Sequence, residues 1–293
     1  MLSKRTSGRP SYAKLGGVEV GEGFPVRVVG VINVSPESFY GGSVAVDRRA
    51  VQRLARRLVA EGADILDIGA MSTAPYVKGA VSEAEESRRM TAAVRAVRAA
   101  VDVPISADTQ RGGVAAAALE AGAQILNDVS GLSYDPALAP LVRAVKGLIL
   151  MASEAAPSAE PPLAMIARRL RDCVRRAIIA GVEPERIVLD PGIGFFRHAA
   201  LPWHQLDCAV LRDLRRLLRL GRPLLVGVSR KSFIGKLTGR ADVAQRLAGS
   251  LAAAAIAVYN GAALIRAHDV AATVDVVRVA QGIRDVVAPG GRR

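Results

Sequence analysis

The feature that most constrains the fold of this chain is an alternation of short apolar runs with longer segments typical of helices. Eight runs rich in Val, Ile and Leu recur along the sequence, and each is followed by a helix-like segment of roughly ten residues or more. Each run is apolar at nearly every position rather than at every second one. Strands of this kind are buried on both faces, which is typical of a parallel sheet covered by helices.

The expected strands are Val26–Asn33, Asp64–Ile68, Pro104–Asp108, Gln124–Asp128, Gly147–Met151, Ile187–Asp190, Pro223–Val228 and Ala263–Ala267. The expected helices begin near Asp47, Ser82, Gly112, Asp135, Pro162, Trp203, Asp242 and Ala271. Eight strand–helix units favour a closed barrel over an open sheet, and the chain's 293 residues suit one such barrel, which takes about 250. The sequence therefore predicts an α/β fold, a single (β/α)8 TIM barrel at 26–287. A short N-terminal extension at 1–25 is expected to form a hairpin beneath it, and 288–293 to form a tail.

Composition narrows the classes of partner. The formal net charge is +13, but the arginines gather in helix-like stretches such as 168–171 and 212–219, which predicts a solvated outer face. No basic run is interleaved with aromatic residues, so we expect no nucleic-acid partner. No apolar stretch reaches the ~20 residues of a membrane span. Cys173 and Cys208 lack the spacing of metal ligands, which fits a reducing cytoplasm and predicts cytoplasmic localisation.

Polar residues stand at the carboxyl ends of most of the expected strands, where barrels of this kind carry their chemistry. They include Asn33, Asp108, Asn127, Asp190, Lys231, Arg266 and His268. One such Asp or Asn is often only a helix N-cap, but that explanation is harder to extend to most of the strand ends together. Converging carboxylates and amides can bind a flat heterocycle with several donors and acceptors, and the basic pair Arg266 and His268 suits an anion beside it.

Several familiar motifs are missing from the sequence. We find no convincing Ser-His-Asp arrangement, no HExxH metal motif and neither a P-loop nor a dinucleotide fingerprint. The sequence therefore gives no indication of a covalent nucleophile, and the chemistry is expected to depend on binding and electrostatics.

Four strings carry a resemblance to a known family. They are Gly30–Phe39, which reads GVINVSPESF, Asp190–Phe195, which reads DPGIGF, Gly227–Ser232, which reads GVSRKS, and Arg266–Val270, which reads RAHDV. Together they resemble the signatures of dihydropteroate synthases, and the likeness extends over roughly 26–287. The resemblance implies a transferase of folate biosynthesis that joins 6-hydroxymethyl-7,8-dihydropterin diphosphate to 4-aminobenzoate or a related arylamine and releases diphosphate. It also implies a homodimer.

The resemblance implies roles for the matched positions. The residues that would read the pterin ring, with its apolar walls, are Asp108, Asn127, Asp190, Lys231, Met151 and Phe195. The diphosphate site would be Asn33, Arg266 and His268, with Mg²⁺ bridging Asn33 and the phosphates. Catalysis would fall to Asn33, Lys231, Arg266 and His268. The side facing the arylamine would be Phe39, Thr73, Pro75 and Ser232. Core filling by Met151 and Phe195, and a helix-capping or supporting role for His268, are the alternatives.

The second loop departs from the family pattern. Met71–Tyr76 reads MSTAPY where the family usually has Glu-Ser-Thr-Arg-Pro-Gly, so Met71 replaces an acid and Ala74 replaces an arginine. These strings are similar to those of a divergent archaeal branch of the family. Because the changes lie where the second substrate should bind, we also expect an acceptor larger than 4-aminobenzoate or without its charge.

Two other functions remain open at this point. Loss of the loop arginine favours a catalytically silent pterin-binding paralogue, which would bind the pterin diphosphate without releasing diphosphate. A pterin-dependent methyltransferase would need no diphosphate site, so the set Asn33, Arg266 and His268 argues against it.

Overall fold

A computed structural model describes residues 11–35, 47–71, 81–153, 159–198 and 200–286, and its centre is an eight-stranded parallel sheet. The strands are β3 (Arg27–Asn33), β4 (Ile65–Gly69), β5 (Ile105–Asp108), β6 (Ile125–Asp128), β7 (Leu148–Met151), β8 (Ile187–Asp190), β9 (Leu225–Gly227) and β10 (Leu264–Ala267). All eight strands expected from the apolar runs are confirmed, almost residue for residue.

The sheet closes on itself. Its strands follow the order β8-β7-β6-β5-β4-β3-β10-β9, and a parallel bridge between Leu189 and Leu224 joins β8 to the chain entering β9. The result is the expected (β/α)8 barrel. All eight carboxyl ends meet at one mouth, because every pairing between neighbouring barrel strands is parallel.

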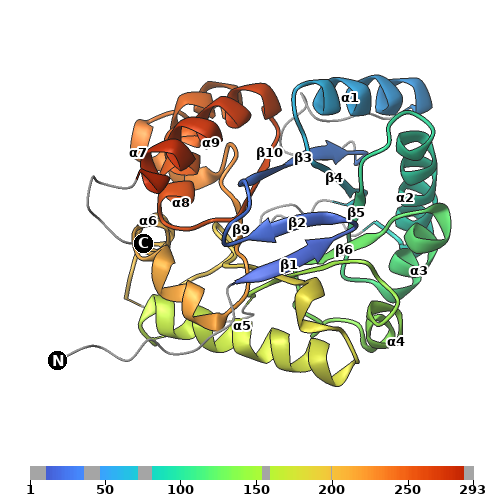
Figure 1. The fold of residues 1–293 in the computed structure, drawn as a ribbon, viewed down its shortest axis with the longest axis horizontal. Coiled ribbons are helices and arrows are strands. Elements are labelled where there is room, and N and C mark those ends of the chain that lie inside the picture. The colour runs from blue at the N-terminus through green and yellow to red at the C-terminus, as the bar shows by residue number, and fades with distance from the viewer. Residues whose placement is uncertain (1–10, 36–46, 72–80, 154–158, 199, 287–293) are drawn as a thin grey trace.

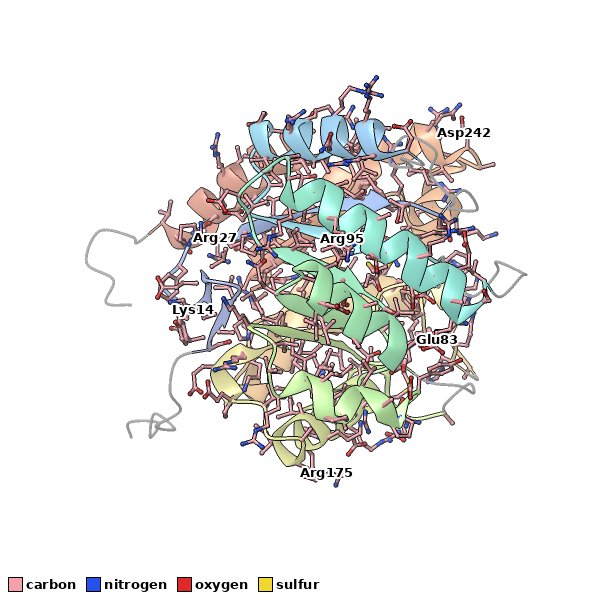
Figure 2. All side chains as sticks on the ribbon, turned by 90° about the vertical axis from the view of Figure 1, so that its right-hand side faces the viewer. Lys14, Arg27, Glu83, Arg95, Arg175 and Asp242 are labelled. Atoms are coloured by element: carbon pink, nitrogen blue, oxygen red, sulfur yellow. The ribbon has the colours of Figure 1, made fainter. Side chains whose placement is uncertain are left out.

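A ring of helices surrounds the strands (Figure 1). The helices are α1 (Arg48–Ala60), α2 (Glu83–Arg98), α3 (Gly112–Ala121), α4 (Ala139–Val142), α5 (Pro162–Ile179), α6 (Trp203–Arg212), α7 (Ser232–Thr238), α8 (Leu247–Tyr259) and α9 (Val270–Asp285). The side chains of Asp47 and Ser82 cap α1 and α2 by accepting backbone N–H groups. In Figure 2, α2 and α3 lie across the near face, and the exposed Glu83 and Arg95 mark the solvent side of α2.

Two helices differ from the prediction. α7 was not expected, because its apolar residues are few and it follows directly on the polar string after β9. The helix expected near Asp135 is instead a 3₁₀ turn at Pro136–Leu138 followed by the single turn α4. Both are too short to show a helical hydrophobic period in the sequence.

The described part of the N-terminal extension is a hairpin under the barrel. β1 (Tyr12–Leu15) pairs with β2 (Val18–Gly21), and the pair crosses the strands on the near side in Figure 1. Leu15 packs with Val29, Ile125 and Leu225 in the lowest layer of the barrel interior. The end opposite the mouth is thereby filled with apolar side chains. The division into 1–25, 26–287 and 288–293 stays a prediction, since 1–10 and 287–293 lie outside the described residues.

Within the described ranges, no single helix has the length and apolar character needed to cross a membrane. Ser232–Thr238 and Val243–Tyr259 meet that test only as a pair, and they are bent by 84° at the break between them.

Candidate active site at the barrel mouth

A cavity opens at the carboxyl ends of β5 to β10. The residues that line it are Asp108, Asn127, Val129, Met151, Asp190, Gly192, Ile193, Phe195, Gly227, Ser229, Lys231, Arg266 and His268. All six residues predicted to read or enclose a pterin are in this set, although they come from strands and loops far apart in the sequence. Barrel closure brings them together, because each follows or ends a strand whose side chains alternate between barrel interior and helix layer.

Arg266 is held inside the barrel by two carboxylates. Its Nε donates to Asp67 Oδ2 at 2.6 Å and its Nη2 donates to Asp108 Oδ2 at 2.8 Å. Asn127 adds a third contact, donating from Nδ2 to the same Asp67 oxygen at 3.1 Å. Although burial disfavours the charge, the attraction of Asp67 and Asp108 outweighs it and raises the pKa of Arg266. The floor of the cavity is therefore a fixed arrangement of charges.

Two carboxylate oxygens in this arrangement have no hydrogen-bond partner among the residues that the structure describes. Oδ1 of Asp67 and Oδ1 of Asp108 are buried and accept no hydrogen bond from the described residues. Burial raises the pKa of Asp108 to about 7, against the attraction of Arg266. Buried acceptors without donors are costly, and they commonly mark the place of a bound donor. Asp108 lines the cavity, so a ligand with N–H groups at its edge could donate to its Oδ1.

Asp190 and Lys231 form the other side of the cavity. Asp190 Oδ1 accepts the Gly192 backbone N–H at 2.7 Å, and burial raises the pKa of Asp190 to about 6. The Lys231 ammonium lies 4.5 Å from the centre of the Phe195 ring, a cation–π distance. Burial lowers the pKa of Lys231, while Asp190 opposes that shift. Lys231 can donate to a ring carbonyl, and Phe195 with the buried Met151 supplies apolar wall.

His268 is a neutral side chain here. Burial, followed by repulsion from Arg266, Arg230 and Lys231, lowers its pKa to about 3. Its Nδ1 lies 2.9 Å from Ser229 Oγ, and the same hydroxyl accepts the His268 backbone N–H at 3.3 Å. The Ser229 hydroxyl therefore contacts both the backbone and the ring of His268 and fixes the orientation of the imidazole. Arg266 and His268 therefore differ from the basic pair that the sequence suggested, since only one of them is charged.

Asn33 and Ser232 lie beside this cavity rather than in its lining. Asn33 ends β3 in register with Gly69, and its Oδ1 would be 3.3 Å from a Cβ added at Gly69. Ser232 begins α7, directly after Lys231. Phe39, Thr73 and Pro75, predicted on the arylamine side, lie outside the described residues.

Sequence reasoning missed two buried acids of the site. Asp67 is fully buried in β4, which reads ILDIG, and a lone acid in an otherwise apolar strand was an available signal. Asp207 lies on the buried side of α6, and its Oδ1 accepts the Gly194 backbone N–H at 2.8 Å. Burial raises the pKa of Asp207 to about 6. Asp207 thereby braces the loop that carries Phe195 and that Lys231 packs against.

Comparisons with known proteins agree with this geometry. The family described as pterin binding enzyme matches residues 29–268. A dihydropteroate synthase of Neisseria meningitidis serogroup B is 40% identical over 278 residues, covering 90% of this chain and 94% of the relative. One from a Synechocystis strain is 38% identical over 264 residues, covering 87% and 89%. A Xanthomonas albilineans dihydropteroate synthase solved with 4-aminobenzoic acid superposes with a TM-score of 0.83 at 38% identity, over 95% of this chain and all of that one.

The chain belongs to the pterin-binding enzyme family. Its activity is that of the dihydropteroate synthases, transferases of folate biosynthesis, which it matches over most of its length. The relatives named above are bacterial, so the comparisons give no support to the archaeal-like branch that the loop strings suggested.

Proposed function

We propose that the cavity between β5 and β10 holds the pterin ring of 6-hydroxymethyl-7,8-dihydropterin diphosphate. The observation that carries this assignment is a buried oxygen of the cavity lining, Asp108 Oδ1, that accepts nothing from the described residues. In the same lining, Asp190 supplies a further acceptor and Lys231 a donor. A pterin carries amine and N–H donors along one edge and a carbonyl beside them, which is the complementary pattern.

The residues of this chain bind and orient rather than exchange protons. In the reaction the bond between the pterin methylene and diphosphate breaks, the arylamine nitrogen bonds that carbon, and the amine gives up one proton. Positive charge develops on the methylene as diphosphate leaves. Preorganised carboxylates beside the ring stabilise that charge, and the walls formed by Met151 and Phe195 exclude water from it.

Asn33, Arg266 and His268 are proposed to hold the diphosphate. In the tautomer that accepts the Ser229 hydroxyl proton at Nδ1, His268 carries an Nε2–H, which is a neutral donor for a phosphate oxygen. Arg266 contributes its charge to the same mouth, although Asp67 and Asp108 hold its guanidinium.

A magnesium ion fits this site as a proposal. Within the described ranges, no group of three or more His, Cys, Asp or Glu side chains is arranged to hold a metal. Mg²⁺ often takes few protein ligands and completes its shell with water and substrate phosphates. The carbonyl oxygen of Asn33 is a suitable single ligand at the mouth, and a bound Mg²⁺ would supply charge neutralisation of the diphosphate.

The arylamine is proposed to enter beside Ser232, with Phe39, Thr73 and Pro75 facing it. Because Met71 and Ala74 remove an acid and an arginine from that loop, we propose an acceptor larger than 4-aminobenzoate or without its carboxylate. Turnover of 4-aminobenzoate with an ordinary KM, in the ~1 μM–1 mM range, would contradict this narrower proposal and leave the synthase activity intact.

The experiment that tests the function combines binding and turnover. Calorimetry measures binding of the pterin diphosphate, and a product assay with several arylamines measures diphosphate release and the new C–N bond. We expect both. Binding without diphosphate release from any arylamine would favour a silent pterin-binding paralogue instead.

We also propose a homodimer formed through α8 and α9. Four large apolar side chains stand exposed there: Ile256, Tyr259, Val279 and Ile283, with exposures of 48–63%. The smaller side chains of Ala255, Val276 and Ala280 line a shallow hollow among them. A contiguous apolar patch of this kind is typical of a protein interface, and the small residues let two copies approach closely.

The cytoplasm is proposed as the compartment. Cys173 and Cys208 form no disulfide, which supports a reducing environment.

A further inference from the structure

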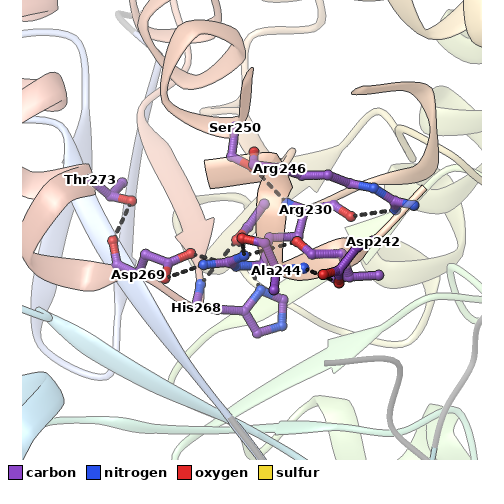
Figure 3. A network of polar contacts seen from close by, with 10 residues as sticks. Arg230, Asp242, Ala244, Arg246, Ser250, His268, Asp269 and Thr273 are labelled. Atoms are coloured by element: carbon purple, nitrogen blue, oxygen red, sulfur yellow. Dashed lines mark hydrogen bonds and ion pairs between the residues drawn. The ribbon is translucent and has the colours of Figure 1, made fainter. Parts of the chain in front are cut away.

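Arg230 is buried next to the site but does not line its cavity. Its side chain is 5% exposed and forms a two-pronged ion pair with Asp269, Nε to Oδ2 at 2.9 Å and Nη2 to Oδ1 at 2.8 Å. Its Nη1 donates to the carbonyl oxygens of Val243 and Ala244, at 2.9 and 2.8 Å. The guanidinium thus joins three segments: the loop after β9, the loop after β10 and the turn before α8 (Figure 3).

The backbone of Arg230 is held as firmly as its side chain. Its φ is +55°, in the left-handed region that side-chain-bearing residues rarely adopt. Its N–H donates to Ser250 Oγ at 2.8 Å, and its carbonyl accepts from Arg246 Nη1 at 3.2 Å. A strained conformation persists only where its surroundings over-determine it, and such positions cluster at functional sites.

We call the Arg230–Asp269 ion pair the clamp. The residues next to it in the sequence belong to the site. Ser229 precedes Arg230 and contacts the His268 ring, while Lys231 follows it and lines the cavity. His268 precedes Asp269, the partner of the clamp. Because β9 and β10 are paired, with Gly227 opposite Arg266, the two loops leave the barrel side by side. The Arg230–Asp269 ion pair therefore links the loop that carries Ser229 and Lys231 to the loop that carries His268.

We propose that Arg230 is a positioning residue, which through Asp269 holds Lys231 and the Ser229–His268 pair in one relative geometry. The proposal rests on the proposed function of this cavity. Arg230 touches neither the pterin nor the diphosphate. Its role is to fix the distance between Lys231, which is proposed to contact the pterin ring, and His268, which is proposed to contact the diphosphate. Both groups can then contact one bound substrate.

The test uses Arg230→Lys and Asp269→Asn in the full chain. A lysine ammonium cannot form a bidentate ion pair with Asp269 and also donate to two carbonyl oxygens. The first variant therefore breaks this arrangement but keeps the positive charge. The second keeps the shape of the partner and removes its charge. Arg27→Lys is the matched control, since Arg27 forms an ion pair with Asp64 3.1 Å long at the opposite end of the barrel.

We expect kcat/KM for the pterin diphosphate to fall on the order of 10²-fold in Arg230→Lys, the loss that a misplacement of about 1 Å produces. Arg27→Lys should leave it unchanged. In a double-mutant cycle with His268→Ala, the two losses should not add, because the clamp acts partly through that histidine. Additive losses, or a kcat/KM in Arg230→Lys equal to that of the control, would overturn the proposal.

A second measurement does not need turnover. The chain has 3 histidines, so the ring nitrogen signals of His268 can be resolved by NMR and assigned with His268→Gln. We expect the Nδ1 signal to move in Arg230→Lys and in Asp269→Asn but not in Arg27→Lys. An unmoved signal in both clamp variants would overturn the proposal even if the wild-type protein proved to have no synthase activity, which separates the two failures.

Discussion

Asp67→Asn is the sharpest test of how the cavity floor is built. One oxygen of Asp67 accepts from Arg266 at 2.6 Å and from Asn127 at 3.1 Å, and the side chain is fully buried. Asparagine keeps the size and one acceptor oxygen but removes the charge. Arg266 would then face a single carboxylate, that of Asp108.

The magnitude follows from what is lost and what remains. Removing one partner of a buried ion pair costs about 3–5 kcal/mol when it strands the other charge. Here Asp108 still pairs with Arg266 at 2.8 Å, so the loss should be closer to that of one charged hydrogen bond, about 1.5–3 kcal/mol. If about 1.4 kcal/mol of that loss also appears in the transition state, kcat/KM falls about tenfold.

Chemical denaturation gives the free energy of unfolding, and steady-state kinetics with the pterin diphosphate gives kcat/KM. Asp64→Asn is the matched control, since Asp64 lies just before the same strand and pairs with Arg27 at 3.1 Å with both side chains 26% exposed. That variant should lose only about 0–1 kcal/mol and keep its kcat/KM. Equal losses in the two variants would refute the reasoning.

Four further results are expected. Burial raises the pKa of Asp108 to about 7 and of Asp190 to about 6, so a pH–rate profile should show kcat/KM falling as the pH drops through that range and acceptors become protonated. Denaturation at a series of pH values should show stability falling as the pH rises from the ordinary Asp pKa of about 4 to the raised folded values, and levelling off above them, because over that window only the unfolded state has released the protons. Flat profiles would contradict both expectations. Lys231→Ala should raise KM and lower kcat, whereas Lys236→Ala, exposed on α7, should change neither, and an unchanged kcat/KM at Lys231 would discredit its contact with the ring. Ile283→Asp should leave a 30.7 kDa monomer in sedimentation velocity, and an unaltered oligomer would place the interface elsewhere.

Much of the architecture could be predicted from local pattern. Eight apolar runs predicted eight strands because burial on both faces makes nearly every position within a strand apolar. Asp47 and Ser82 marked the starts of α1 and α2, since their side chains cap helices in a way that depends on sequence neighbours alone. The short helix α7 was missed because a helix of about two turns leaves too little periodic signal.

The site was predicted in part. Parallel strands place all their carboxyl ends at one mouth, so polar residues at those ends, such as Asp108 and Asp190, were expected to gather there. Nothing in the local sequence says which of them pair. Asp67 and Arg266 are 199 residues apart and meet only across the closed barrel, so neither the ion pair nor its unpartnered oxygens could be foreseen.

By itself the sequence determined the parts: where strands run, where helices begin and which polar groups follow each strand, because those depend on periods and caps within a few residues. Tertiary structure alone decided their charge states and partners. Burial at the mouth makes His268 neutral and raises the pKa of Asp108 to about 7, and the pairing of β9 with β10 sets Arg230 against Asp269. Solvation and distance are properties of the closed barrel, and no stretch of the chain carries them before it folds.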